Sequence, residues 1–396
     1  MRHFDTVTAH AAQSNKAMEN ITGEIRTRAH EALWPKPAME EWRRSAVPSK
    51  VAVPGDYAET DIRWEVSPED EDSVEVSIGI HEESAALLLN DINDRQTLLD
   101  YEHRENILSE LPNSVTVRVR PGRELNNPVL LRYAYNGNGR RYDAHTFVFG
   151  GDESKARIIE IHEGIGGNSF VTAGAHIQSG QASHIDHIVL QNVSDATVFV
   201  YQAFSRVERD SAYRCFEGQF GSSVAKSRIT ADCTGPGADV KMNGVYTSYG
   251  KQKKDVKPVQ RHSSPRCSSR SFYKGVVQGD GSSVFQGIIE VAEGAFETDA
   301  YLSNKNLLLN DGARADSIPN LEILNNNVKC SHGSTTGTLN EDELFYLQAR
   351  GISREEGRRM LIEAYFENAL GMLDEGPARE EVYAALAQFM KNWEGS

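Results

Sequence analysis

A long succession of short β-rich segments between residues 114 and 337 restricts the fold of this chain more than any other feature of its sequence. The segments include SVTVRV, HTFVFG, RIIEIHE and ATVFVYQAF, and turns rich in Gly, Asn, Asp and Ser separate them. A β-solenoid and a β-sandwich both fit this pattern. Small residues recur where segments begin, as at Ala182 and Ala196. Because small residues at turns suit stacked coils, we expect a mainly β fold with a solenoid core.

The patterns divide the chain into three regions. Residues 1–113 form a mixed region, with helical spacing of apolar residues in the first 50, strand-like alternation over 73–80 and a helix over 84–108. Residues 114–337 form the solenoid, and residues 338–396 form a helical domain. A solenoid needs covered ends, and we expect the helical regions to provide them.

Helix-start signals are clear in the C-terminal region. Asn340 with Glu343, and Ser353 with Glu356, have the spacing of capping boxes, and Pro377 suits the first turn of a third helix. Three short helices cannot bury their own apolar faces, so we expect them to pack on the β-element or on a partner.

Composition limits the function. The 396 residues carry a formal net charge of −15, which argues against nucleic acid as a partner because phosphate binding needs a basic surface. No apolar run approaches the ~20 residues that cross a bilayer, and the N-terminus lacks the apolar region of a secretory signal. We therefore expect a cytoplasmic protein with no membrane partner.

Four cysteines are expected to be free thiols in a reducing compartment. None belongs to a C-x-x-C motif, and their spacings match no zinc pattern. This excludes a self-contained zinc ribbon, but it allows ligands offered to a site shared with another chain. The cysteines are Cys215, Cys233, Cys267 and Cys330.

The stretch VKCSHGSTTG contains the most suggestive pair, Cys330 and His332. Two positions apart on a strand, their side chains share one face and lie about 7 Å apart along it. Half of a metal site is one interpretation. The other is that Cys330 is a small buried hydrophobe and His332 caps the following turn.

A second candidate pair, His262 and Cys267, lies in the basic stretch 251–270, which holds seven Lys or Arg and one acid. Basic neighbours could lower the pKa of the Cys267 thiol. The stretch itself is interpreted either as a solvated loop or edge, or as a contact for an anion or acidic partner.

Other polar residues are also candidates for chemistry. In SHIDH, His184 and Asp186 face one side of a strand and His187 the other, so a structural role is favoured. Asp186, Asp232 and Asp239 are the candidate acids of a β-helix carbohydrate-active enzyme, but the sequence places no two of them on one face.

The segment NVKCSHGSTTGTLNEDELFYLQARGIS, residues 327–353, resembles the C-terminal signature of the SufB/SufD family of iron–sulfur cluster assembly proteins. Three further segments are similar to stretches of the same family: SVFQGIIEVAEGAFETDAYLSNKNLLLNDGARADSIPNLEIL (283–324), HSSPRCSSRSFYKGVV (262–277) and AMEEWRRSAVP (38–48). Within the family, the signature favours the SufD branch.

The resemblance implies a right-handed parallel β-helix with helical ends, in agreement with the solenoid expected from the segments. It further implies a non-catalytic scaffold subunit of a SufB–SufC–SufD complex, in which SufB and SufD pair through their β-helices and SufC is an ABC-type ATPase. The nascent, transient iron–sulfur cluster forms at that interface. His332 is then the preferred cluster ligand and Cys330 its weaker neighbour. Association of a flavin with the complex is left open.

The resemblance also implies that the ATPase docks on the helical C-terminal region. SufB chains usually carry an N-terminal cysteine cluster, whereas this chain has no cysteine before Cys215. A SufD role is therefore favoured over a SufB-like or homodimeric scaffold, and a carbohydrate-active enzyme is a distant alternative. The residues expected to contact the ATPase are Leu344, Phe345, Tyr346, Leu347, Arg350 and Gly351.

Overall fold

The computed structural model describes these residues: 58–81, 83–87, 113–164 and 167–391. The helical spacing in the first 50 residues, the segment 38–48 and most of the helix expected over 84–108 lie outside them. Where described, that helix is present over 83–87. The strand expected over 73–80 is β2 (Val74–Ile78).

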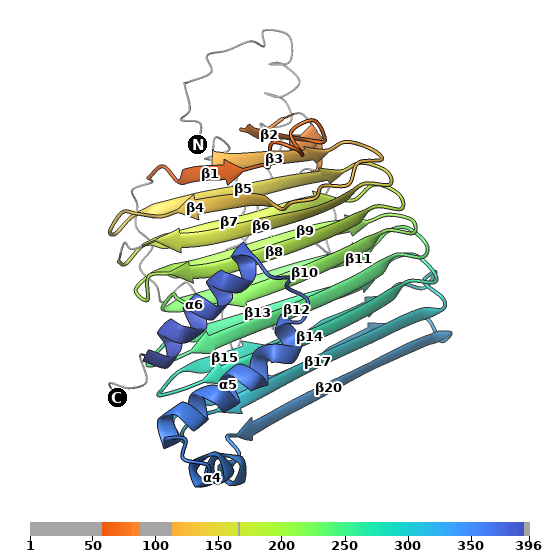
Figure 1. Ribbon diagram of the computed structural model, residues 1–396. Coiled ribbons are helices and arrows are strands. Elements are labelled where there is room, and N and C mark those ends of the chain that lie inside the picture. Colours follow the sequence, from red (N-terminus) through yellow and green to blue (C-terminus); the bar gives the residue numbers. More distant parts are fainter. Residues whose placement is uncertain (1–57, 82, 88–112, 165–166, 392–396) are drawn as a thin grey trace.

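The described chain folds into two facing sheets, and each coil contributes a strand to both (Figure 1). Successive coils pair in parallel, whereas β1 and β2 pair antiparallel with their neighbours. The result is the predicted parallel β-solenoid, with about 8 turns. In spatial order, the nine-stranded sheet contains β1 (Asp61–Glu65), β4 (Val129–Ala134), β6 (Lys155–Gly164), β8 (His184–Val193), β10 (Ala212–Gln219), β12 (Asp239–Ser248), β14 (Ser268–Val277), β17 (Thr298–Leu308) and β20 (Val328–Thr338). The eleven-stranded sheet contains β2, β3 (Ser114–Val119), β5 (Arg141–Gly150), β7 (Phe170–Gln178), β9 (Val198–Val207), β11 (Val224–Cys233), β13 (Lys253–His262), β15 (Ser282–Phe285), β16 (Ile288–Val291), β18 (Arg314–Ser317) and β19 (Asn320–Ile323).

The turns from the eleven-stranded to the nine-stranded sheet repeat one backbone feature. A residue with a left-handed conformation occurs there in successive coils. Hydrogen bonds join these turns between neighbouring coils, from the Ser179 hydroxyl to the Arg206 carbonyl, 27 positions apart, and from the Gln181 N–H to Asp152, 29 positions apart. Ala182 occupies this turn before β8, and Ala196 lies after β8 at the opposite turn. The left-handed residues are Glu153, Ala182, Asp210, Gly237, Arg266 and Glu297.

Three helices follow the solenoid: α4 (Glu341–Ala349), α5 (Arg354–Leu370) and α6 (Pro377–Lys391). The predicted caps are confirmed. The Asn340 side chain accepts hydrogen bonds from two backbone N–H groups of α4, and the Ser353 hydroxyl accepts one from Glu356 at 3.1 Å. Pro377 opens α6.

Helices α5 and α6 cross the outer face of the nine-stranded sheet (Figure 1). Their apolar side chains pack on the outward-facing residues of the strands, which confirms that the C-terminal helices pack on the β-element. They cover a face of the solenoid, so the expectation that they cap its end does not hold for these two helices. The packed residues include Ile159, Leu190, Phe216, Val245, Ile362, Phe366, Val382, Leu386 and Phe389.

The central part of the basic stretch 251–270 is not a solvated loop or an edge. It forms β13, an internal strand of the eleven-stranded sheet, and all but the first residue of β13 are buried. Two ion pairs join β13 to its neighbours: Arg261 pairs with Glu290 of the next coil at 2.7 Å, and Asp255, the single acid of the stretch, pairs with Lys226 of β11 at 2.9 Å. The solvated interpretation holds only for the flanking residues, which include the exposed Lys251, Arg266 and Arg270.

Candidate functional site at the open end of the solenoid

The last coil of the solenoid, formed by β18, β19 and β20, leaves one side of each strand without a neighbour among the described residues. β18 pairs with β15, β19 with β16 and β20 with β17. Figure 1 shows β20 as the outermost strand of its sheet. We call this coil the open end. A long uncovered edge strand is a template for pairing with another strand.

Apolar side chains of the core continue into the open end. Leu321 stacks on Ile289, and Ile323 on Val291, in the parallel register of β19 and β16. The two β16 residues are buried, whereas Leu321 and Ile323 are more than one third exposed and Leu324 is 74% exposed. The hydrophobic core therefore ends at a surface that another coil could cover.

Cys330 and His332 lie on the inner face of β20. Cys330 is in register with Ala300 and His332 with Leu302, and both β17 residues are buried in the core. Cys330 packs on that core and is half-buried, whereas His332 is exposed. Burial raises the pKa of the Cys330 thiol, which disfavours the thiolate that binds metals. The open end thus offers one exposed imidazole and one less available sulfur.

Helix α4 presents two large side chains to solvent. Phe345 is 72% and Tyr346 57% exposed, and the Arg350 guanidinium lies 4.8 Å from the centre of the Tyr346 ring. Among the residues expected to contact a partner, these three have exposed side chains.

Leu344 is fully buried within this chain, which differs from its expected role as a partner contact. It packs where helices α4 and α5 meet, so close to Gly357 that a Cβ there would lie 2.9 Å from the leucine Cδ1. Leu347 is half-buried beside it, and Gly351 has the left-handed backbone (φ 87) that ends α4. These three residues shape the helix and its turn.

The two secondary candidates, His262 and Cys267, come together with a third residue that the sequence did not single out. Cys233 ends β11 and is the direct partner of His262 at the end of β13, and Cys267 lies in the turn before β14. One ligand atom from each lies within 4.8 Å of the other two, and all three residues are buried. We call this group the Cys/His cluster.

The two thiols of the Cys/His cluster interact through a hydrogen bond. A hydrogen bond from Cys233 is the main cause that lowers the pKa of Cys267 to about 5, and interactions with His262 and the Ala238 backbone lower it further against the effect of burial. The same hydrogen bond raises the pKa of Cys233. The pKa of Cys267 is thus lowered mainly by Cys233, with His262 of the basic stretch as a further cause.

The SHIDH residues have structural partners. His184 lies 2.8 Å from Asp186 on the outer face of β8, and Asp186 also pairs with Arg157. His187 points into the core, where it lies 2.8 Å from the Glu160 carboxylate. The opposite orientation of the two histidines confirms the structural interpretation.

The other two candidate acids are engaged as well, each on a different sheet. Asp232, on β11, accepts a hydrogen bond from Ser263 at 2.7 Å, and Asp239, on β12, accepts one from Ser268. Nothing in these contacts gathers an acid pair suited to glycoside cleavage.

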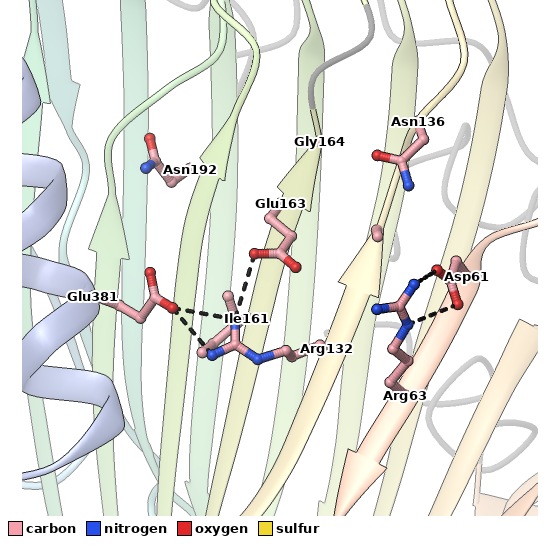
Figure 2. Close-up of a pocket in the computed structure, with 10 residues that line it drawn as sticks. Asp61, Arg63, Arg132, Asn136, Ile161, Glu163, Gly164, Asn192 and Glu381 are labelled. Atoms are coloured by element: carbon pink, nitrogen blue, oxygen red, sulfur yellow. Dashed lines mark hydrogen bonds and ion pairs between the residues drawn. The ribbon is translucent and has the colours of Figure 1, made fainter. Parts of the chain in front are cut away.

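A pocket on the outer face of the nine-stranded sheet lies between β1 and α6 (Figure 2). Its guanidinium groups are paired with carboxylates: Arg132 with Glu163 and Glu381, and Arg63 with Asp61. The pair with Glu381 joins α6 to the sheet. Both guanidinium groups of the pocket are therefore engaged in ion pairs with carboxylates of its own lining.

The fold defines the class: a two-sheet parallel β-solenoid with an uncovered last coil. A family model described as "SUF system FeS cluster assembly, SufBD core domain" matches residues 133–365. The match covers more than half of the chain, which therefore belongs to the SufBD family. Within the described residues, no helix has both the length and the apolar content to cross a bilayer.

Curated relatives agree with this family. The iron–sulfur cluster assembly protein SufD of Escherichia coli is 28% identical over 307 residues, covering 75% of this chain and 72% of that protein. A SufBD family protein of Mycobacterium bovis is 29% identical over 283 residues, covering 69% and 70%. Protein ABCI7, chloroplastic, of Arabidopsis thaliana is 29% identical over 264 residues, covering 64% and 56%. The resemblance stated from the sequence is confirmed.

Proposed function

We propose that this chain is a SufD-type scaffold subunit of a SufB–SufC–SufD assembly and is not itself an enzyme. The open end pairs with a SufB-type subunit, and an iron–sulfur cluster forms as transient cargo at that interface. The observation that carries the proposal is the uncovered β20 edge with His332 exposed on its inner face. ATP hydrolysis belongs to the SufC-type partner.

The chemistry of the open end supports this pairing. An incoming strand would satisfy the backbone groups on the free side of β20, as in other cases of strand addition. The exposed Leu321, Ile323 and Leu324 would be covered at the same time, which adds a hydrophobic contribution to affinity. Imidazole is a suitable ligand for iron, and one ligand from this chain leaves the others to the partner.

Replacing His332 with alanine should prevent cluster build-up on the co-purified complex. The ligand is lost, while the backbone of β20 that carries the pairing is unchanged. The measurement is iron and acid-labile sulfide content, together with the visible absorption of the complex, after anaerobic expression with all three subunits.

Ser331 supplies the matched control, because it lies on the same strand but its side chain points to the opposite face. Ser331→Ala should keep both the complex and the cluster. A normal cluster yield from His332→Ala would refute the ligand role. Loss of the complex in that variant would show that the His332 side chain is needed for subunit pairing, which contradicts the proposal that only cluster binding depends on it.

We further propose that the exposed face of α4 contacts the SufC-type ATPase. Changing both Phe345 and Tyr346 to aspartate should remove most of this contact, because exposed aromatic residues are frequent binding hot spots. Co-elution with the ATPase should fall at least about tenfold in size-exclusion chromatography. Gln348→Asp, an exposed substitution on the same helix, adds charge without removing an aromatic ring and should bind normally. Unchanged co-elution of the double variant would contradict the assignment.

The alternative within the family is a SufB-like or homodimeric scaffold. The same open end could pair with a second copy of itself, because strand addition does not require a different chain. The mass in solution, measured with and without a SufB-type subunit, separates the two assemblies. A stable homodimer that excludes the SufB-type chain would favour the alternative.

A further inference from the structure

The Cys/His cluster has a donor set that suits a metal ion. Two thiols and one imidazole lie within 4.8 Å of one another in the interior of the solenoid. In a tetrahedral zinc site with Zn–S of about 2.3 Å and Zn–N of about 2.0 Å, the donors lie about 3.5–4 Å apart. The three side chains therefore need only a small inward adjustment to share one ion.

The backbone fixes the positions of all three donors. Cys233 and His262 lie directly opposite each other in the parallel strand pair β11–β13. Cys267 follows Arg266, whose left-handed conformation (φ 57) turns the chain back toward β14. A Cβ at Gly235 would lie 2.0 Å from the backbone nitrogen of Arg209, so the turn after Cys233 packs tightly on the coil below. Donors held in this way lose little freedom on binding a ligand.

His262 has one ring nitrogen in a hydrogen bond and the other without a hydrogen-bond partner among the described residues, the combination that a metal-binding histidine needs. Its Nε2 lies 2.8 Å from the Ser269 hydroxyl, and both residues are buried. The other ring nitrogen, Nδ1, is buried and has no hydrogen-bond partner in the described chain. Metal-binding histidines commonly use one nitrogen for the ion and engage the other in a hydrogen bond that fixes the ring.

We propose that Cys233, His262 and Cys267 form an internal binding site for a divalent borderline metal ion, Zn²⁺ or Fe²⁺. Thiolate and imidazole are the ligands such ions prefer. Charge favours a divalent ion over a monovalent one. Two thiolates and a 2+ ion are neutral together, and a neutral group is far less costly to bury in the surrounding apolar core.

This site is distinct from the open end. Ser269, the hydrogen-bond partner of His262, pairs in register with Ala300 of the next coil, and Ala300 pairs with Cys330 of the coil after that. Cys330 therefore lies two coils away from Ser269. The inference goes beyond the proposed function: it concerns a site within one chain and does not need a partner subunit.

Titration of the full-length, reduced and metal-free chain with Co²⁺ tests the proposal. One equivalent should bind and give the intense sulfur-to-cobalt and d–d absorption of tetrahedral thiolate coordination, and Zn²⁺ should displace it. Cys233→Ser and Cys267→Ser should each weaken binding at least about tenfold. Cys215→Ser, a buried control in the same core, and Cys330→Ser should bind as the wild type.

Ser269→Ala provides a variant that keeps all three ligands. Loss of the hydrogen bond to His262 should weaken Co²⁺ binding about tenfold without changing the circular dichroism spectrum. This variant decides the question if a cysteine variant does not fold. Absence of thiolate–cobalt absorption in the wild type, its persistence in both Cys233→Ser and Cys267→Ser, or its loss in Cys330→Ser would overturn the proposal.

Discussion

The substitution Ser334→Pro should lower the affinity for the scaffold partner at least about tenfold, or about 1.4 kcal/mol, while the chain itself stays folded. The reason is the alternation of backbone groups in a parallel sheet. The backbone N–H of Asp299 on β17 donates to the Cys267 carbonyl on the β14 side, so the backbone groups of the even-numbered residues of β17 point to β20. Leu302 of β17 lies opposite His332 of β20, so the odd-numbered residues of β20 form the hydrogen bonds to β17. The backbone N–H of Ser334, an even-numbered residue, therefore points to the free edge.

Ser334→Ala is the matched control for this experiment, because it removes the hydroxyl and keeps the backbone N–H. The dissociation constant of the partner should change in Ser334→Pro and not in Ser334→Ala, and sedimentation or interferometry can measure both. The melting temperature of the isolated chain should be similar for both variants, since the lost N–H has no partner among the described strands. Equal affinity of the two variants for the partner would contradict pairing through this edge.

Much of the fold could be predicted from the sequence because its signals are local. Alternating strands such as β6 and β8, and the caps at Asn340 and Ser353, depend on residues a few positions apart. The long repeat was harder to detect. The residue with left-handed conformation in each coil is Glu153 in one and Ala182, Asp210 or Arg266 in others, so no regular glycine marks the turn.

The candidate sites were predictable to different degrees. His332 and Cys330 are neighbours on one strand, so strand alternation alone places them on one face. Cys233 could not be found in this way: it lies 34 positions before Cys267 in the chain, and only the stacking of β11 on β13 brings it beside His262. A search for inward-facing Cys and His one coil apart would have found it, once the coil length was known.

The role of Leu344 illustrates the opposite difficulty. Its neighbours Phe345 and Tyr346 have the same apolar character, and the sequence treats the three as one partner-binding group. The structure separates them because a helix turns by about 100° per residue. Leu344 therefore points to Gly357 of α5 and Phe345 to solvent.

The interior of the solenoid also contains a buried polar network centred on Glu160. Its carboxylate lies 2.8 Å from His187 Nε2 and 3.3 Å from His162 Nε2. Tyr213 and Tyr135 engage the remaining nitrogens of the two rings, at 2.9 Å and 2.8 Å. Every ring nitrogen in the network thus has a partner, which makes the burial of a carboxylate tolerable.

Replacing Glu160 with glutamine should lower the free energy of unfolding by about 3–5 kcal/mol at neutral pH, because one partner of a buried charged network is removed. Burial alone would raise the pKa of Glu160, but hydrogen bonds from His162 and His187 outweigh it and lower the pKa to about 2. The carboxylate therefore contributes its full stability above its ordinary pKa of 4.5 and loses it as the pH falls toward about 2. The wild type should lose this contribution in acid, and Glu160→Gln has none to lose. The difference between their free energies of unfolding should therefore narrow below about pH 4.5.

Glu163→Gln is the control, because Glu163 lies on the same strand but is half-exposed and paired with Arg132 on the surface. It should cost less than about 1 kcal/mol. Urea unfolding of the three proteins at neutral pH and at about pH 3.5 gives the required free energies. If Glu160→Gln is no less stable than Glu163→Gln, or if its deficit persists unchanged in acid, the network does not contribute through an ionised Glu160.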